Sequence, residues 1–307
     1  MGETLEGNSS RWTCALVAED LGIILAGGSA TRLRPVTTVV SKQLLPVYDK
    51  PVIYYPLTSL ILAGFRKIAL ISTSSALPLY KALFGDGSFL GIEIHYVEQP
   101  EPNGLATAFL LTEPLITNRN SALILGDNLF HGSQFGQNLS SLRLNKGAQI
   151  FAYAVDHPEE YGVVTFDETG NATGLYEKPK DFKSNWAIPG FYFYDDTVVE
   201  RAKSLKPSQR GELEITDLNA TYLQTRNLVV LKVSRGTAWL DLGTPDGLLD
   251  ASEYVRTLQL RQGVPIGSPE EATWRVGNIS TDEFLRITEQ HPSPYYRRLL
   301  LRALENR

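Results

Sequence analysis

Short apolar segments alternate with helix-like segments in the first half of the chain, and this alternation restricts the fold more than any other feature. Predicted strands cover residues 21–25, 68–71, 92–97 and 122–125, and predicted helices cover residues 51–63, 77–84 and 105–111. Apolar runs of this length, bounded by turns, are typical of buried strands. Strands that alternate with helices are joined by right-handed crossovers. The sequence therefore predicts an α/β fold, in which a mostly parallel sheet has helices on both faces.

In the rest of the chain, the pattern of predicted elements changes twice, first to mainly strands and then to mainly helices. Predicted strands at residues 149–155, 162–166, 172–177 and 190–194 form a β-rich stretch, and a helix at 213–226 and a strand at 228–233 follow it. Further predicted helices cover residues 248–260, 281–289 and 295–305. We expect a mixed sheet with an antiparallel extension and a helical annex. The predicted boundaries are an N-terminal extension at 1–20, a core at 21–245 and a C-terminal annex at 246–307, which belongs to the same domain because no linker separates it.

Composition excludes several classes of protein. Hydrophobic residues are 43% of the 307 residues and charged residues 21%, which is ordinary globular usage. The net charge of −5 argues against nucleic acid as a partner. No apolar run approaches the roughly 18–20 residues that span a bilayer, and residues 1–20 lack the pattern of a secretory signal. The single cysteine, Cys14, cannot form an internal disulfide, so we expect a reducing, cytoplasmic location and no membrane partner.

A glycine-rich turn follows the first predicted strand. Gly27 and Gly28 lie directly after this strand, Arg32 and Arg34 follow, and Lys42 comes shortly afterwards. Such a turn lets backbone N–H groups approach an anion, and the cations suit a ligand rich in phosphate. The structural alternative is a tight turn with solvated arginines. The turn lacks the third glycine of a dinucleotide-binding loop and the Gly-Lys-Ser/Thr ending of a P-loop, which argues against a nucleotide-dependent oxidoreductase.

Two aspartates occupy similar positions in separate parts of the chain. Asp127 follows the predicted strand at 122–125, and Asp241 follows a strand-like run and stands two positions before Gly243. Mg²⁺ binds proteins through one or two carboxylates together with substrate phosphates. Each aspartate alone favours a structural role, in a turn or as a helix cap. Together they predict a shared metal site, although their spacing does not show that they meet.

Several motifs, taken together, resemble those of the sugar-1-phosphate nucleotidyltransferases. The longest are Leu-Ala-Gly-Gly-x-x-Thr-Arg-Leu-x-Pro at residues 25–35 and Ser-Lys-Gln-Leu-Leu-Pro-Val-Tyr-Asp-Lys-Pro at 41–51. Shorter matching segments occur in the family's order at residues 98–100, 103–106, 125–128, 161–164, 177–179, 190–195, 210–217 and 238–244. The resemblance extends from residue 21 to about the C-terminus. It implies a Rossmann-like mixed, mostly parallel sheet flanked by helices, in which the β-rich extension binds the sugar.

The resemblance also implies a role for each matching residue. The implied nucleotide-binding residues are Gly27, Gly28, Thr31, Arg32, Gln43, Gln99, Gly104 and Asp127. The implied sugar-phosphate residues are Tyr161, Gly162, Glu177, Lys178 and Trp239, of which Trp239 is also consistent with a packed core tryptophan. Asp127 and Asp241 would bind Mg²⁺, the implied cofactor. Arg32, Lys42 and Lys178 would act on the reacting phosphates.

Three positions depart from the family's pattern. Ala30 stands where the turn usually has glycine, Asn103 replaces a usual aspartate, and Leu242 replaces a usual threonine. We therefore expect a slightly altered turn and a base preference that differs near Asn103. No implied catalytic position is lost.

The implied reaction joins two small molecules. A phosphate oxygen of glucose 1-phosphate attacks the α-phosphorus of dTTP, and pyrophosphate leaves. Two alternatives stay open: the same chemistry with UTP or another sugar phosphate, and a non-catalytic regulatory homologue that senses a nucleotide sugar. Family members are often homotetramers with a nucleotide-sugar effector between subunits, and the helical annex is the expected source of that interface.

Overall fold

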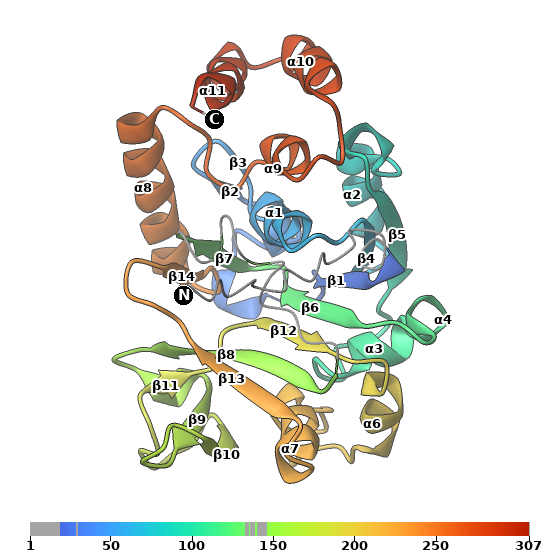
Figure 1. Ribbon diagram of the computed structural model, residues 1–307, viewed down its shortest axis with the longest axis vertical. Helices are drawn as coiled ribbons and strands as arrows, with labels where there is room; N and C mark the ends of the chain where they lie inside the picture. The colour runs from blue at the N-terminus through green and yellow to red at the C-terminus, as the bar shows by residue number, and fades with distance from the viewer. Residues whose placement is uncertain (1–18, 29, 133–134, 136–138, 140–145, 307) are drawn as a thin grey trace, which may run out of the picture.

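The computed structural model describes residues 19–28, 30–132, 135, 139 and 146–306, which form a ten-stranded mixed sheet with helices on both faces (Figure 1). The strand order is β10-β9-β11-β8-β12-β6-β1-β4-β5, and β13 also pairs with β8. The predicted α/β class is thereby confirmed. Cys14 and most of the expected N-terminal extension lie outside the described residues.

The parallel half of the sheet holds four strands in the order β6-β1-β4-β5. Their bounds are Ser121–Leu125 (β6), Leu21–Leu25 (β1), Lys67–Ser72 (β4) and Glu93–Glu98 (β5). The chain moves outward from β1 to β4 and β5, and then returns to the other side of β1 as β6. The strand order therefore reverses between β1 and β6. In open α/β sheets, ligands bind outside the carboxyl ends of the strands at such a switch point.

The other half of the sheet is mostly antiparallel, as expected. Strand β12 (Phe191–Tyr194) runs antiparallel to both β6 and β8 (Ala148–Ala154), and β13 (Leu228–Lys232) runs parallel to β8. Strands β9 (Gly162–Phe166), β10 (Ala172–Glu177) and β11 (Trp186–Ala187) complete this extension by antiparallel pairing.

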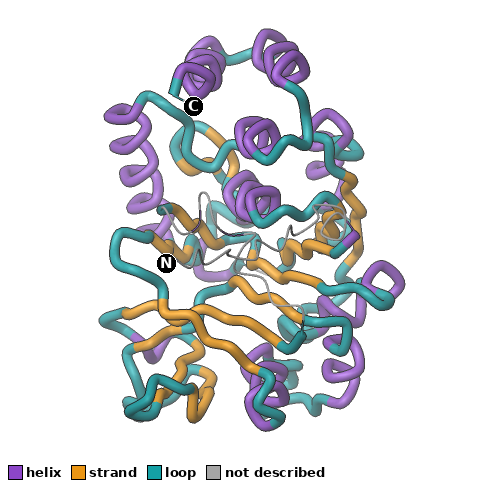
Figure 2. The backbone as a smooth tube through the Cα atoms, viewed as in Figure 1, coloured by secondary structure: helices purple, strands orange, loops and turns teal. Residues whose placement is uncertain are grey.

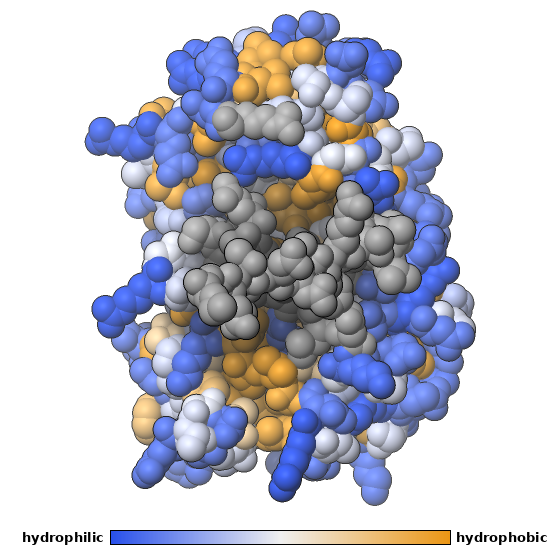
Figure 3. All heavy atoms as spheres, in the orientation of Figure 1, coloured by the Kyte–Doolittle hydropathy of each residue, from blue (hydrophilic) through white to orange (hydrophobic). Residues whose placement is uncertain are grey.

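Helices divide the core into two hydrophobic layers. Helices α1 (Tyr54–Leu62), α2 (Leu77–Phe84) and α9 (Pro269–Arg275) lie on one face, and α3 (Thr107–Leu111), α6 (Val198–Ser204) and α7 (Ile215–Gln224) lie on the other (Figure 1). Neighbouring residues of β1 point to opposite layers, since Ile24 packs in the first cluster and Ile23 in the second. This is the period-two alternation of a strand that is buried on both faces. Hydrophilic residues occupy most of the outline of the visible face (Figure 3).

Short elements surround the switch point. The 3₁₀ helices η2 (Thr31–Leu33) and η3 (Lys42–Leu44) follow β1, and the hairpin of β2 (Pro46–Val47) and β3 (Lys50–Pro51) follows η3. Strand β7 (Asn128–His131) pairs with β14 (Ala238–Asp241) in a separate antiparallel ribbon. The strand-like run before Asp241 is therefore a strand, and β7 was not predicted. The remaining short elements are η4 (Ser88–Leu90), η6 (Pro158–Glu160) and α4 (Glu113–Ile116).

The C-terminal residues form helices, as predicted. Helix α8 (Pro245–Gln262) begins three residues before the predicted start, because Thr244 caps it with a 3.1 Å bond from the Gly247 N–H. Helices α10 (Thr281–Gln290) and α11 (Pro294–Glu305) lie beside each other at one end of the molecule (Figure 2). Helix α9 was not predicted. Across the described part of the chain, no helix has the length and apolarity needed to cross a membrane.

A buried lysine joins these helices to the core. Lys50 is only 4% exposed, and its Nζ donates to Asp49 Oδ1 (2.5 Å), Gln259 Oε1 (3.1 Å) and the Ile266 carbonyl (3.0 Å). Gln259 Nε2 in turn donates to Asp49 Oδ2 (2.8 Å). Burial lowers the pKa of Lys50, and the Asp49 carboxylate opposes that change. The β2–β3 hairpin and α8 are therefore tied by a closed polar network.

Glu271 on α9 is buried beside this network and gives a prediction about pH. Burial raises the pKa of Glu271 to about 7, although Arg275 (3.3 Å) and Lys50 oppose the rise. A carboxyl whose pKa is raised on folding stabilises the protein below its ordinary pKa of 4.5, and this stability is lost as pH rises through 7. We expect Glu271→Gln to match wild type in urea unfolding at pH 5, and to be more stable on the order of 2 kcal/mol at pH 8. The exposed control Glu289→Gln should leave the pH dependence unchanged, and an unaltered profile in Glu271→Gln would contradict the assignment.

Candidate active site

Two carboxylates from distant parts of the chain meet beside the switch point. Asp127 joins β6 to β7, and Asp241 is the last residue of β14, opposite Asn128 in the ribbon. The Leu242 N–H donates to the Asp127 carbonyl at 2.9 Å. Burial and the nearby Asp127 charge raise the pKa of Asp241 to about 6. The two predicted metal ligands are therefore brought together.

Two cations converge on the same carboxylates. Lys42 Nζ forms an ion pair with Asp127 Oδ2. Arg32 lies against Gly243, where an added Cβ would stand 2.8 Å from Arg32 Nη2 and 3.3 Å from both Asp241 carboxylate oxygens. The charges of Lys42 and Arg32 both oppose the rise in the pKa of Asp241. Four charged side chains from four separate segments thus share one site.

The glycine-rich turn is left-handed at Ala30, the position where the family's pattern usually has glycine. Gly28 has φ +102°, and Ala30 has φ 43° and ψ 39°, which is the left-handed region. This conformation costs a non-glycine residue roughly 1–2 kcal/mol. The Thr37 hydroxyl donates to the Ala30 carbonyl (2.8 Å) and holds it in place. Thr31, which follows, is exposed and begins η2.

Two glutamine side chains pack against glycines at the strand ends. An added Cβ on Gly27 would lie 2.1 Å from Gln99 Oε1, so only glycine leaves space for this buried amide. Gln43 lies against Gly126, where an added Cβ would be 3.1 Å from its Cγ. The structure therefore places both predicted amides next to the turn and the end of β6.

Gly104 occupies a position that only glycine can fill. Its φ is +99°, and an added Cβ would lie 2.4 Å from the Leu213 carbonyl oxygen. Asn103 accepts the Leu213 N–H through its own carbonyl at 2.9 Å. This predicted nucleotide-binding residue is thus fixed to the segment that precedes α7.

An aromatic pair borders the carboxylates. The rings of Tyr161 and Trp239 meet edge to face, with centroids 5.0 Å apart. Burial raises the pKa of Tyr161, the Asp241 charge adds to the rise, and Arg32 opposes it. The phenol of Tyr161 is therefore within electrostatic range of the charged site. Trp239 is a packed tryptophan, and its packing against Tyr161 places it at the border of the charged site.

Glu177 and Gly162 lie opposite each other on β10 and β9. Thr216 Oγ1 donates to Glu177 Oε2, and an added Cβ on Gly162 would lie 3.4 Å from the same oxygen. Lys178 follows β10, is exposed, and donates its backbone N–H to the Tyr161 carbonyl at 3.1 Å. The structure therefore brings together Tyr161, Gly162, Glu177 and Lys178. It gives no contact between the Lys178 amine and the carboxylates.

Sequence reasoning assigned no role to Asn128. Its side-chain oxygen accepts from the Gly190 N–H (3.2 Å) and from Trp239 Nε1 (2.8 Å), and its Nδ2 donates to Asp127 Oδ1 (3.2 Å). This residue links one carboxylate to the aromatic pair. Its position directly after Asp127 in the Leu-Gly-Asp-Asn motif was the available signal.

Arg210 and Thr216 were also missed. Arg210 Nη2 contacts Glu177 Oε1 (3.4 Å) and binds both carboxylate oxygens of Glu214 (2.9 Å each). Both residues lie in the matching segment 210–217, for which only Glu212 and Glu214 had been considered, either to close the sugar pocket or to cap the helix that follows.

The donor set fits Mg²⁺ bound together with phosphates. Within the described ranges, no three His, Cys, Asp or Glu side chains form a cluster that could hold a metal alone. The site offers two carboxylates instead, and Mg²⁺ needs only one or two when substrate phosphates and water complete its shell.

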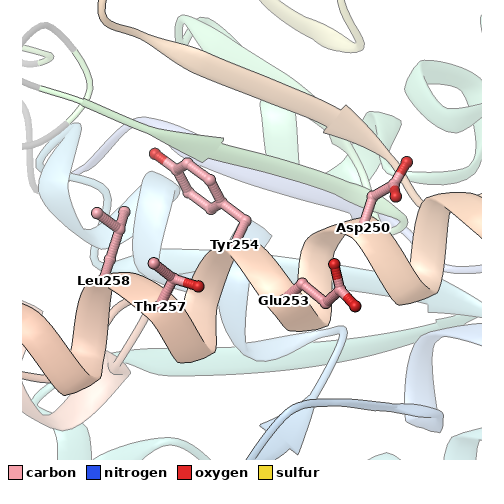
Figure 4. Close-up of a pocket in the computed structure, with 5 residues that line it drawn as sticks. All are labelled: Asp250, Glu253, Tyr254, Thr257 and Leu258. Carbon is pink, nitrogen blue, oxygen red and sulfur yellow. The ribbon is translucent and has the colours of Figure 1, made fainter.

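Two surface recesses lie elsewhere. One, of about 340 Å³, is lined by Asp250, Glu253, Tyr254, Thr257 and Leu258, all on α8 (Figure 4). The other, of about 170 Å³, lies between α1, α9 and the end of β7, and includes His131 and Glu271. Neither recess includes the paired aspartates. The first recess is formed by residues of a single helix. The candidate site is therefore identified by the convergence of charged side chains and not by the volume of a recess.

Comparison with known proteins agrees with this geometry. A family model described as nucleotidyl transferase matches residues 21–257. A glucose-1-phosphate thymidylyltransferase of Mycolicibacterium smegmatis is 52% identical over 284 residues, covering 92% of this chain and 99% of the relative. That of Neisseria meningitidis is 50% identical over 285 residues, with the same coverage. A Bacillus anthracis crystal structure, assigned as a glucose-1-phosphate thymidylyltransferase in complex with sucrose, is 36% identical, covers 77% of this chain and 95% of its own, and has a TM-score of 0.71.

Proposed function

Because the chain belongs to the nucleotidyl transferase family, we propose that it is an enzyme that forms dTDP-glucose and pyrophosphate from dTTP and glucose 1-phosphate. The observation that carries this function is the meeting of Arg32, Lys42, Asp127 and Asp241 at the switch point. Two cations suit a triphosphate, and two carboxylates suit the metal that accompanies it.

The proposed reaction is an in-line displacement. A phosphate oxygen of glucose 1-phosphate forms a bond to the α-phosphorus of dTTP, the bond from that phosphorus to the β-phosphate oxygen breaks, and pyrophosphate leaves with the electron pair. Phosphoryl chemistry of this type requires positioning and charge stabilisation rather than a protein nucleophile. Arg32 and Lys42 neutralise the nucleotide phosphates, and Lys178 orients the attacking phosphate.

We propose Mg²⁺ as the cofactor, held by Asp127 and Asp241. When bound, Mg²⁺ supplies Lewis acidity and a template for the phosphates. Asn128 donates to Oδ1 of the Asp127 carboxylate, and the Lys42 ammonium pairs with its Oδ2. The protein thus fixes one metal ligand before any substrate arrives.

The remaining residues divide between two substrates. We propose that Gly27, Gly28, Thr31, Gln43, Gln99 and Gly104 bind the nucleotide, and that Tyr161, Gly162, Glu177 and Trp239 bind the sugar. This division is supported by position, since the nucleotide residues follow strands of the parallel half. Of the sugar residues, Gly162 and Glu177 belong to β9 and β10, Tyr161 directly precedes β9, and Trp239 packs against Tyr161.

Removal of the charged side chains of Arg32 and Lys178 should affect different substrates. We expect Arg32→Ala to raise the KM for dTTP and Lys178→Ala to raise the KM for glucose 1-phosphate. Each loses a charge-assisted hydrogen bond to phosphate, which should lower kcat/KM about 10- to 100-fold for the affected substrate. Steady-state kinetics with each substrate varied in turn measures the division, and Arg286→Ala, at an exposed arginine on α10, is the control. Impairment of the same substrate in both variants would contradict it.

The identity of the substrates is tested with a substrate panel. We expect pyrophosphate release from dTTP only when glucose 1-phosphate is added, a modest preference for dTTP over dUTP, and poor use of dATP. The methyl group of thymine is worth only about 1–3 kcal/mol of discrimination. Comparison of dUTP with UTP isolates the ribose hydroxyl. Equal use of dATP and dTTP would contradict the base site, and release of pyrophosphate with no panel member would favour the regulatory homologue.

We further propose that the enzyme is a homotetramer with a nucleotide-sugar effector between subunits, in a reducing cytoplasmic compartment. The helices after Thr244 expose Leu249 and Leu260 (58% and 56%), which supports an interface on α8. Sedimentation analysis tests the assembly, and a titration of dTDP-sugars against activity tests the effector.

A further inference from the structure

The Ser41 hydroxyl has two hydrogen-bond partners and only one proton. It donates to Gln43 Oε1 at 2.8 Å and lies 2.9 Å from the Tyr80 hydroxyl. A hydroxyl has one donor and can also accept. Because the carbonyl oxygen of Gln43 can only accept, Tyr80 must donate to Ser41. The three side chains therefore form a directed relay from Tyr80 through Ser41 to Gln43.

The first member of the relay is held firmly. Tyr80 lies on α2, is fully buried, and packs in the same hydrophobic cluster as Ile24 and Ile68 of the parallel sheet. Burial raises the pKa of its phenol, so the hydroxyl keeps its proton and remains a donor. Nothing in the proposed reaction requires a tyrosine at this place.

The last member lies at the switch point. Gln43 is 3% exposed, its backbone carbonyl accepts the Ile53 N–H at 2.9 Å, and its side chain lies against Gly126. Gly126 donates its N–H to the Leu25 carbonyl (2.9 Å), so the Gln43 side chain lies beside the ends of β1 and β6. It is also the neighbour of Lys42, which pairs with Asp127.

The amide of Gln43 has an oxygen that accepts hydrogen bonds and an NH₂ group that donates them. The relay occupies the oxygen. With Oε1 engaged by Ser41, the end of Gln43 that remains for a ligand is the NH₂ group, which only donates. Without Ser41 and Tyr80, a half-turn of the amide would present its oxygen instead. An oxygen there would repel any acceptor atom of the ligand.

We propose that Tyr80 and Ser41 are positioning residues that set Gln43 as a hydrogen-bond donor to an oxygen of the bound nucleotide. This inference rests on the proposed function. The test below distinguishes two candidate acceptors, the 4-carbonyl of thymine and the 3′-hydroxyl of the sugar, which share acceptor chemistry. Cytosine carries an amino donor in place of that carbonyl, and a 3′-deoxy nucleotide lacks that hydroxyl.

The test is a double-mutant cycle with Tyr80→Phe and Gln43→Ala. We expect Tyr80→Phe to raise the KM for dTTP about three- to tenfold, which is the effect of one hydrogen bond, and to leave the KM for glucose 1-phosphate unchanged. In the Gln43→Ala background, Tyr80→Phe should have no further effect. Ser41→Ala should behave in the same way. Tyr194→Phe is the matched control, because Tyr194 is also buried and its hydroxyl donates to Asn219 Oδ1 (2.7 Å), which is outside the relay.

Two analogues identify the acceptor. The effect of Tyr80→Phe on kcat/KM should disappear with 2′,3′-dideoxythymidine triphosphate if the acceptor is the hydroxyl, and with dCTP if it is the carbonyl. Persistence of the full effect with both analogues would overturn the proposal, as would a Tyr80→Phe effect of equal size in the Gln43→Ala background. Wild-type enzyme that releases no pyrophosphate from dTTP and glucose 1-phosphate would overturn the proposed function itself, so the two failures are distinguishable.

Discussion

Asp241→Asn is expected to lower kcat at least about 100-fold while leaving the protein folded. The substitution is nearly isosteric and removes one of the two carboxylates that meet at the switch point. The loss of a metal ligand costs several kcal/mol in the transition state, and each 1.36 kcal/mol is a tenfold change in rate. Asp127→Asn should have an effect of the same size.

Stability should change in the opposite direction from activity. The pKa of Asp241 is raised to about 6 by burial and by Asp127, so its ionised form is unfavourable in the folded protein without metal. The stability associated with the protonated form is present below the ordinary pKa of 3.8 and is lost as pH rises through 6. Metal-free Asp241→Asn should therefore unfold at the same or higher urea concentration than wild type at pH 7.5.

The control for this prediction is Asp246→Asn, an exposed aspartate in the first turn of α8. We expect it to retain full activity. The metal assignment fails if Asp241→Asn keeps wild-type kcat at saturating Mg²⁺, or if its activity is lost only because the protein unfolds.

Lys50→Met is expected to destabilise the protein by about 3–5 kcal/mol. Removal of one partner from a buried ion pair leaves the other charge without compensation, and this is one of the largest effects of a single substitution. Here the orphaned group would be Asp49, with Gln259 losing a donor as well. Equilibrium unfolding in urea measures the loss as a shift in midpoint.

Lys67→Met is the matched control, because Lys67 forms an exposed ion pair with Glu19 at 2.9 Å. Surface pairs contribute about 1 kcal/mol or less. In Lys50→Met, partial recovery of stability by the second change Asp49→Asn would identify the uncompensated charge as the cause. Equal midpoints for Lys50→Met and Lys67→Met would contradict the role of the buried network.

Much of the fold could be predicted because its signals are local. The strands at residues 21–25 and 162–166 and the helix at 77–84 were placed with their observed bounds, since each is a short patterned segment between turn residues. Strand β7 could not be predicted from Asn128–His131 alone. Four residues carry too little pattern, and they become a strand because β14 pairs with them.

The candidate site could likewise be predicted only where its signals are local in the sequence. The glycine turn, Lys42 and Asp127 could be proposed from residues that are close in sequence, and the resemblance to a known family supplied the roles. The contacts of Asn128 with Trp239 and of Ser41 with Tyr80 could not be predicted, because each contact joins segments that are distant in the chain. Such pairs depend on the register of the sheet and on side-chain conformations, which a single sequence does not display.

The ribbon of β7 and β14 has a consequence for how the enzyme becomes active as it folds. Its two strands are far apart in the chain, and it stands outside the ten-stranded sheet. Closure of so long a loop is entropically costly, and non-local pairings of this kind slow folding. A chain whose parallel sheet has already formed would still hold Asp127 without Asp241. If Asp127 and Asp241 act together as proposed, we expect the recovery of catalysis during refolding to report the closure of this ribbon, and the recovery of secondary structure to report the sheet.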